Sequence, residues 1–211
     1  LECDSLLTEQ QRESVSEILT AGRHLLNLID EILDLAKIET QQLKLSMKRV
    51  NVYTVMQECI QIVKSMALKR NITIIDLTSA LKNMSVEVDA TRLSQIILNL
   101  LTNAIKYNRD NGKVYIFAQK TPHGIKIEVK DTGAGIPKKE IEHIFEPFYR
   151  LKSTKGSTEG SGIGLALVQQ LVQLLGGKYG VNSEEGKGSS FWVYIPLVDG
   201  KRKNSPPPFP V

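Results

Sequence analysis

The chain has 211 residues, of which 41% are hydrophobic and 24% are charged. These values are typical of a globular protein and exclude a disordered chain, a collagen-like repeat and a disulfide scaffold. The net charge is only +4, and Lys201, Arg202 and Lys203 supply three of the positive charges, so composition gives no reason to expect nucleic-acid binding. No apolar stretch approaches the roughly 18 residues needed to cross a bilayer. We therefore expect no membrane contact by this segment and a cytoplasmic location, whether or not its parent protein is anchored in a membrane.

The first predicted element is a long helix from Thr8 to Leu43. Thr8 and Gln11 have the spacing of a capping box, in which the two side chains satisfy backbone N–H groups at the start of a helix. Apolar or small residues then recur in alternating steps of three and four, which is the heptad pattern of a coiled-coil seam. The seam consists of Val15, Ile18, Gly22, Leu25, Ile29, Ile32, Ala36 and, after a break, Leu43, flanked by Leu19, Leu26 and Leu33.

So wide an apolar stripe needs more partner surface than one coiled-coil strand provides. The rest of the chain offers no second helix of similar length. The partner must come from another copy, from a segment outside this sequence, or from both, and we expect the parent protein to form a homodimer through this helix.

The middle of the chain, residues 45–198, mixes helical and strand periodicities. Helices and strands interleave without a regular βαβ repeat, which favours an α+β fold: an α/β sandwich whose mixed sheet is covered on one face by helices. The predicted helices are 51–67, 91–107 and 162–175, and the predicted strands are 72–77, 113–120, 125–130 and 191–195. Residues 199–211 are rich in proline and read as a tail or linker.

Asn99, Asn103 and Lys106 lie on one face of the predicted helix 91–107, at positions i, i+4 and i+7. A solvated polar stripe would explain them equally well on spacing alone. Asparagine is a poor helix former, however, and two carboxamides one turn apart offer the neutral oxygens that Mg²⁺ accepts together with phosphate and water.

Asp131 continues the apolar parity of the strand before it, which carries Ile125, Ile127 and Val129. We therefore expect its carboxylate to point toward the helices, at the floor of a pocket. An Asx turn leaving the strand is the alternative. A carboxylate in this position can accept a hydrogen bond from an exocyclic amine such as that of adenine, and Gly133 and Gly135 would let the backbone approach a flat ring closely.

The segment Gly160-Ser161-Gly162-Ile163-Gly164-Leu165 opens the predicted helix 162–175. Glycines at a helix start expose backbone N–H groups, and the helix dipole favours anionic phosphate oxygens there. The spacing fits neither a dinucleotide-binding fingerprint nor a P-loop.

Four motifs in this order resemble the sensor histidine kinases of two-component systems. Asn99-Leu-Leu-Thr-Asn103-Ala-Ile-Lys106-Tyr107 resembles their N box, and Asp131-Thr-Gly133-Ala-Gly135-Ile136 their first glycine box. Phe145-Glu-Pro-Phe148-Tyr-Arg150 resembles their F box, and the segment from Gly160 to Leu165 their second glycine box. Residues 1–44, with Leu33-Asp-Leu-Ala-Lys-Ile-Glu39, resemble the second helix of the dimerisation hairpin.

The resemblance implies the ATP-binding sandwich shared with DNA gyrase B, MutL and a related chaperone, with ATP and Mg²⁺ as ligands and a response regulator receiver domain as partner. Asn103 would bind Mg²⁺, Lys106 and Arg150 would contact phosphates, Asp131 would bind the adenine amine and Tyr107 would cover the nucleotide. Gly160, Gly162 and Gly164 would offer N–H groups as a lid, about residues 152–161, closes. Ile136, Phe148, Ser161, Ile163 and Leu165 belong to the same nucleotide-binding motifs.

Two features of the sequence bear on catalysis. The hydrolytic relatives carry a glutamate at the turn of Asn99, and an asparagine cannot act as a general base, so phosphoryl transfer to a histidine fits better than hydrolysis. The family's acceptor histidine precedes a short Glu-containing run that is absent near His24, His123 and His143. We therefore expect this segment to bind ATP without phosphorylating itself. A non-catalytic nucleotide-binding module for dimerisation or interaction is the alternative.

Overall fold

The computed structural model describes residues 8–151 and 161–197. One long helix, α1 (Glu9–Glu39), precedes an α/β sandwich. The helices of the sandwich are α2 (Val52–Lys69), α3 (Ala90–Lys106) and α4 (Gly164–Leu174), with short 3-10 turns η2 (Ser79–Leu81) and η3 (Lys138–Glu140). Its strands are β1 (Lys48–Asn51), β2 (Thr73–Leu77), β3 (Ser85–Val88), β4 (Lys113–Thr121), β5 (Gly124–Asp131), β6 (Lys178–Glu184) and β7 (Gly188–Pro196).

The predicted start of α1 is confirmed in detail. The Thr8 hydroxyl accepts the Gln11 N–H at 3.3 Å, and the Gln11 side chain accepts the Thr8 N–H at 2.9 Å. The predicted end at Leu43 is wrong, because the helix ends at Glu39 and Thr40 caps it. Gln41 then adopts a left-handed conformation with φ of 56°, which an α-helix cannot continue through.

The main sheet has five strands in the order β2-β4-β5-β7-β6. β2 pairs parallel to β4 and every other pair is antiparallel, so the sheet is mixed, as predicted. The predictions missed β6, and they missed β1 and β3, which form a separate antiparallel pair. β1 and β3 have only four residues each, and no residue of β6 is fully buried, so each gives only a weak periodic signal.

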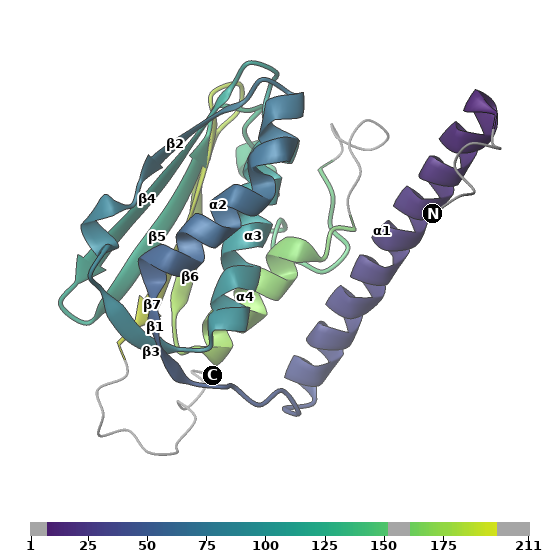
Figure 1. The fold of residues 1–211 in the computed structure, drawn as a ribbon. Coiled ribbons are helices and arrows are strands. Elements are labelled where there is room, and N and C mark those ends of the chain that lie inside the picture. The colour runs from purple at the N-terminus through teal and green to yellow at the C-terminus, as the bar shows by residue number, and fades with distance from the viewer. Residues whose placement is uncertain (1–7, 152–160, 198–211) are drawn as a thin grey trace.

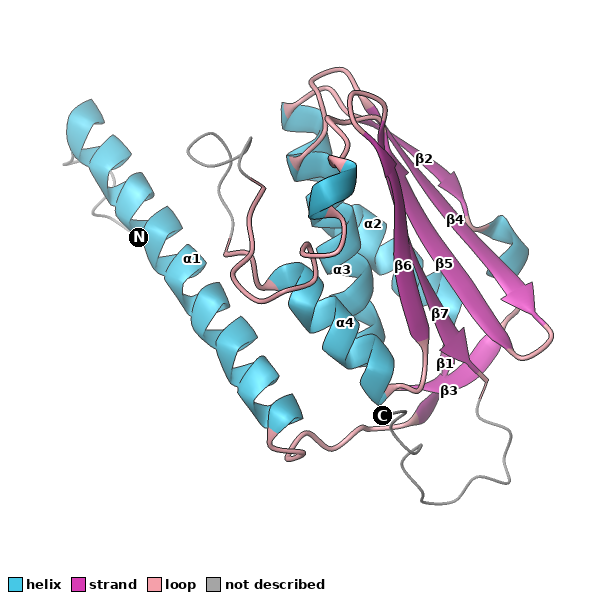
Figure 2. Cartoon of the chain, turned by 180° about the vertical axis from the view of Figure 1, so that it is seen from behind, coloured by secondary structure: helices cyan, strands magenta, loops and turns pink. Residues whose placement is uncertain are grey.

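Helices α2, α3 and α4 cover one face of the main sheet (Figures 1 and 2). β5 shows why the layers fit, since Ile125, Ile127, Val129 and Asp131 are all buried while the residues between them are partly or fully exposed. Alternate side chains therefore enter the core between sheet and helices. The prediction from this alternation, that Asp131 points inward, is confirmed.

The helix α1 runs beside the sandwich and contacts it through its C-terminal half (Figure 2). Leu35 and Ile38 are buried against the sandwich core, and Asp34 pairs with Arg92 of α3 at 2.7 Å. Within α1 the predicted seam lies exposed in the single chain, with Ile18 at 70% and Leu25 at 59%, whereas Leu43, beyond the helix, is partly buried against the core. No helix in the described ranges is long and apolar enough to span a bilayer.

Candidate functional site

A pocket of about 330 Å³ lies where the C-terminal end of α3 faces the ends of β5 and β7. Cavities of this size hold small-molecule ligands in proteins. The described residues that line it come from helix, sheet and connecting loops: Arg70, Asn103, Lys106, Tyr107, Asn108, Asp131, Ala134, Gly135, Ile136, Ile144, Tyr149, Arg150, Leu151, Leu165, Ser189 and Phe191.

The floor of the pocket carries the buried carboxylate of Asp131, which is 4% exposed. Its Oδ1 accepts the backbone N–H groups of Gly133 at 2.8 Å and Ser189 at 3.2 Å. Burial raises the pKa of Asp131 to about 6, although the backbone donors act in the opposite direction. The carboxylate is thus held in a fixed orientation and keeps acceptor capacity for a ligand.

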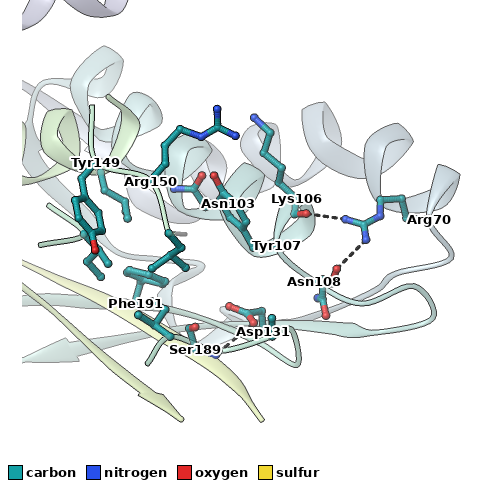
Figure 3. A pocket seen from close by; sticks show the side chains of 16 residues that line it. Arg70, Asn103, Lys106, Tyr107, Asn108, Asp131, Tyr149, Arg150, Ser189 and Phe191 are labelled. Carbon is teal, nitrogen blue, oxygen red and sulfur yellow. Dashed lines mark hydrogen bonds between the residues drawn. The ribbon is translucent and has the colours of Figure 1, made fainter. Parts of the chain in front are cut away.

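The opposite side of the pocket is polar and cationic. Figure 3 shows the side chains of Lys106 and Arg150 extending toward the same side, with Asn103 between them and Asp131 across the pocket. Burial raises the pKa of Tyr107, and the positive charge of Arg150 opposes that shift. The pocket therefore has an acceptor at one end and two cations with a carboxamide at the other.

Arg70, at the end of α2, fixes the position of the polar side, and the sequence analysis did not identify it. Its guanidinium donates to the carbonyl oxygens of Ile105 at 2.7 Å, Lys106 at 2.8 Å and Asn108 at 2.7 Å. These carbonyls belong to the end of α3 and the residues after it, where a helix leaves acceptors unsatisfied. Arg70 consequently holds the turn that carries Lys106 and Tyr107.

A second, smaller hollow of about 130 Å³ adjoins the cationic side and shares Asn103, Lys106 and Tyr107 with the main pocket. It is the hollow in which Asn99 meets the second glycine box. The other described residues around it are Glu31, Thr102, Ile144, Tyr149, Ser161, Gly162, Gly164 and Leu165. A Cβ on Gly164 would lie 2.7 Å from Asn99 Oδ1, so the glycine lets the start of α4 approach this side chain closely.

Several residues of the predicted site are not among the residues that line the two hollows. Gly133 lines neither hollow, and a Cβ there would lie 2.3 Å from the Tyr107 carbonyl oxygen, so the close packing of this turn requires glycine. Ile163 is 1% exposed and belongs to the hydrophobic core. Gly160 and residues 152–159 of the predicted lid lie outside the described residues.

Of the two F-box residues predicted at the site, Arg150 lines the main pocket and Phe148 does not. Phe148 is 65% exposed, lines neither hollow and has φ of 64°, while its N–H donates to the Gly162 carbonyl at 3.0 Å. The next residue, Tyr149, lines both hollows. The F box therefore joins the second glycine box through its backbone, and Tyr149 faces the pocket.

The sequence analysis also missed the lining residues Ser189 and Phe191. Ser189 contributes through its backbone N–H, a group that every residue except proline has, so its residue type gives no sign of this role. Phe191 lies in the predicted final strand, where strand alternation could have indicated an inward position.

The fold and the pocket together define a nucleotide-binding α/β sandwich. Residues 88–199 match the family described as histidine kinase-, DNA gyrase B-, and HSP90-like ATPase. The chain belongs to this family, and its nucleotide-binding region is of the sensor histidine kinase type.

The similar proteins bear this out. The circadian input-output histidine kinase CikA of Synechococcus elongatus is 38% identical over 195 residues, 90% of this chain and 26% of that protein. The sensor histidine kinase RcsC of Escherichia coli is 33% identical over 199 residues, 92% of this chain and 21% of that protein. The crystal structure of full-length ShkA in complex with AMPPNP superposes with a TM-score of 0.79 and 30% identity, over 90% of this chain and 40% of that chain. This chain thus spans only about a fifth to a quarter of these two curated relatives.

Proposed function

We propose that this chain is the part of a sensor histidine kinase that binds Mg²⁺ and ATP and presents the γ-phosphoryl group to a histidine. The observation that carries the proposal is the polarity of one pocket. Its buried acceptor, Asp131, lies across from a side formed by Asn103, Lys106 and Arg150. ATP has the matching polarity, with an amine donor on the base and anionic phosphates at the other end.

At the base end, Asp131 would accept a hydrogen bond from the adenine amine. Its orientation is set by the Gly133 and Ser189 N–H groups, so little freedom is lost on binding. Guanine presents a carbonyl oxygen in place of that amine, and two acceptors would face each other. Tyr107, Ile136 and Phe191 line the same pocket and would contact the base and sugar.

At the phosphate end, Lys106 and Arg150 would neutralise charge and Gly162, Gly164 and Leu165 would bring the start of α4 to the phosphates. The residues present fit a magnesium ion, because Mg²⁺ takes few protein ligands and completes its shell with substrate phosphates and water. Asn103 would supply the protein oxygen. Bound Mg²⁺ would neutralise charge on the phosphates during transfer.

Transfer itself requires an imidazole in line with the γ-phosphoryl group, and catalysis would consist mainly of positioning and charge stabilisation. Asn99 lines the smaller hollow of about 130 Å³, which we call the phosphate-side hollow, and an asparagine supplies no general base. We assign residues 1–44 to the second helix of a dimerisation hairpin, 45–198 to the ATP-binding domain and 199–211 to a tail. The acceptor histidine would come from the partner helix of that hairpin, for relay to a response regulator receiver domain.

Calorimetric titration with ATP and GTP in the presence of Mg²⁺ tests the proposal. The unmodified chain is expected to prefer ATP, and Asp131→Asn should reduce that preference by about 1 to 3 kcal/mol, because the new amide places a donor where an acceptor is required. Asp110→Asn, at an exposed position outside the pocket, is the matched control and should leave the preference intact. Equal affinity for ATP and GTP in the unmodified chain would refute the role of Asp131.

A further inference from the structure

The phosphate-side hollow contains a carboxylate that comes from outside the sandwich. Glu31 of α1 lines the hollow together with Asn103 and Lys106, and it is the only acidic residue among those described around it. Its Oε2 accepts a hydrogen bond from the Ser161 hydroxyl at 2.9 Å. Ser161 belongs to the second glycine box, and its Oγ also accepts the Ile163 N–H at 3.2 Å.

The packing of α1 holds Glu31 in this place. One turn further along the helix, Asp34 accepts hydrogen bonds from Arg92 at 2.7 Å and Gln95 at 2.9 Å. The Asp34 and Arg92 side chains are 17% and 19% exposed, so water screens this pair only in part. Leu35 and Ile38 add buried apolar contacts on the same side of α1. Glu31 therefore enters the hollow as part of a docked helix and not as an isolated flexible side chain.

A negative charge at this place opposes the binding of further negative charge. The hollow adjoins the cationic side of the pocket and includes the residues proposed to contact phosphates, so a third phosphate group would meet both the Glu31 carboxylate and an occupied Ser161 hydroxyl. Between partly buried charges this repulsion is only partly screened. A diphosphate places less charge at this end of the pocket.

We infer that Glu31 makes docked α1 a selector between nucleotides: docking favours ADP over ATP, and binding of ATP favours release of α1 from the sandwich. The inference rests on the proposed nucleotide site and adds a regulatory role for a residue outside it. Coupling between two binding equilibria is reciprocal. Whatever holds α1 against the sandwich therefore weakens ATP binding, and bound ATP weakens the docking of α1 by the same factor.

The decisive variant is Glu31→Gln, which removes the charge, keeps the size of the side chain and keeps an acceptor for Ser161. We expect this variant to raise the affinity for ATP about tenfold, the effect of one partly screened charge. The affinity for ADP should change by less than about twofold, and calorimetry in Mg²⁺ measures both. Asp30→Asn is the matched control. It makes the same charge change one residue earlier, at a position that lines the outer hollow between α1 and α3 and not the phosphate-side hollow, and it should leave the ATP to ADP ratio unchanged.

A second variant weakens the docking of α1 without changing the charge of Glu31. Arg92→Ala removes the anchor of Asp34 and leaves Glu31 in the sequence, and it should shift the ATP to ADP ratio in the same direction as Glu31→Gln. Hydrogen exchange gives an independent readout, since ATP should speed exchange of the backbone amides of residues 28–38 more than ADP does. That difference should disappear in Glu31→Gln.

Three results would overturn the inference. They are weaker ATP binding by Glu31→Gln, which would make the carboxylate part of the phosphate or metal site, an equal effect on ATP and ADP, and no effect. If the unmodified chain binds no nucleotide, the proposed function fails and the inference with it. If nucleotide binds with its predicted preference for adenine and the ratio does not move, only the inference fails.

Discussion

The two ends of the pocket are built in different ways. The base end is part of the sheet, where Asp131 is fixed by donors from Gly133 and from Ser189 on the neighbouring strand. The phosphate end is assembled from the ends of helices, held by Arg70, and is bordered by Glu31 from α1. Base recognition should therefore depend on the sandwich alone, while phosphate chemistry should depend on how the helices and α1 are arranged.

The largest expected effect concerns phosphoryl transfer, which we propose to depend on the phosphate end of the pocket and on an acceptor histidine in the other helix of the hairpin. The chain alone should bind ATP and acquire no acid-labile label from γ-labelled ATP, because we propose that the acceptor imidazole belongs to the other helix of the hairpin and must be held in line for transfer. A protein that also carries the proposed acceptor helix should become labelled, and Asn103→Asp should reduce that labelling by disturbing the proposed metal site.

His24→Gln is the control for this experiment. Acid-labile label on the chain alone that disappears in His24→Gln would make His24 the acceptor and would contradict the assignment of residues 1–44 to the second hairpin helix.

Replacing Arg70 should give the next largest effect, and it should affect the phosphate end of the pocket more than the base end. Arg70→Ala leaves the carbonyls at the end of α3 without their charged donor, which should cost about 2 to 3 kcal/mol of the free energy of unfolding. It should also lower the affinity for ATP more than the affinity for adenosine, because Lys106 and Tyr107 lie on the turn that Arg70 holds. Urea denaturation and calorimetry measure the two effects.

Asp110→Asn is the matched control for Arg70. It removes only the exposed partner of the same guanidinium, at 2.9 Å with the Asp110 side chain 71% exposed, and exposed ion pairs contribute less than about 1 kcal/mol. Equal losses in the two variants would show that the buried carbonyl contacts do not stabilise the turn.

Much of the base end could be predicted from sequence, because it follows from local periodicity. The alternation of Ile125, Ile127 and Val129 continued to Asp131 and correctly placed its carboxylate inward. The helical spacing of Asn99, Asn103 and Lys106 likewise brought these residues to one region, at the two adjoining hollows.

The phosphate end could be predicted only in part, because its remaining contacts join residues far apart in the chain. Arg70 meets carbonyls 35 to 38 residues later, and Glu31 meets a hydroxyl 130 residues later. Periodicity identified the apolar seam of α1 but not its second, docking face. That face mixes Glu31 and Asp34 with Leu35 and Ile38, and it is recognisable only against the surface of the sandwich.

The pH dependence of ATP binding should reveal the protonation of Asp131 at the base end. The pKa of Asp131 is raised from 3.8 to about 6, and we expect the adenine amine to bind the ionised carboxylate as its acceptor. ATP affinity should therefore fall about tenfold between pH 7 and pH 5, as one proton is taken up. Stability should change in the opposite direction, since the folded state binds this proton more tightly than the unfolded state, so protonation between about pH 6 and pH 4 stabilises the fold.

Asp131→Asn removes this titration and is the control, because the phosphates of ATP titrate in both proteins. The difference between the two pH profiles should contain a single step near pH 6. Parallel profiles would show that Asp131 does not govern adenine binding.

The smallest expected effect is weak self-association through the exposed seam of α1. Each seam side chain contributes about 1.5 to 3 kcal/mol only when fully buried, and α1 without the proposed other helix of the hairpin should bury its seam only in part. Ile18→Ser should reduce association measured by sedimentation velocity. Ile62→Ser should not, because Ile62 is similarly exposed, 63% against 70%, but lies on α2. A strict monomer at the highest attainable concentration, with α1 still helical by circular dichroism, would mean that the exposed seam does not drive association of this chain, whereas equal losses in both variants would trace association to general surface hydrophobicity.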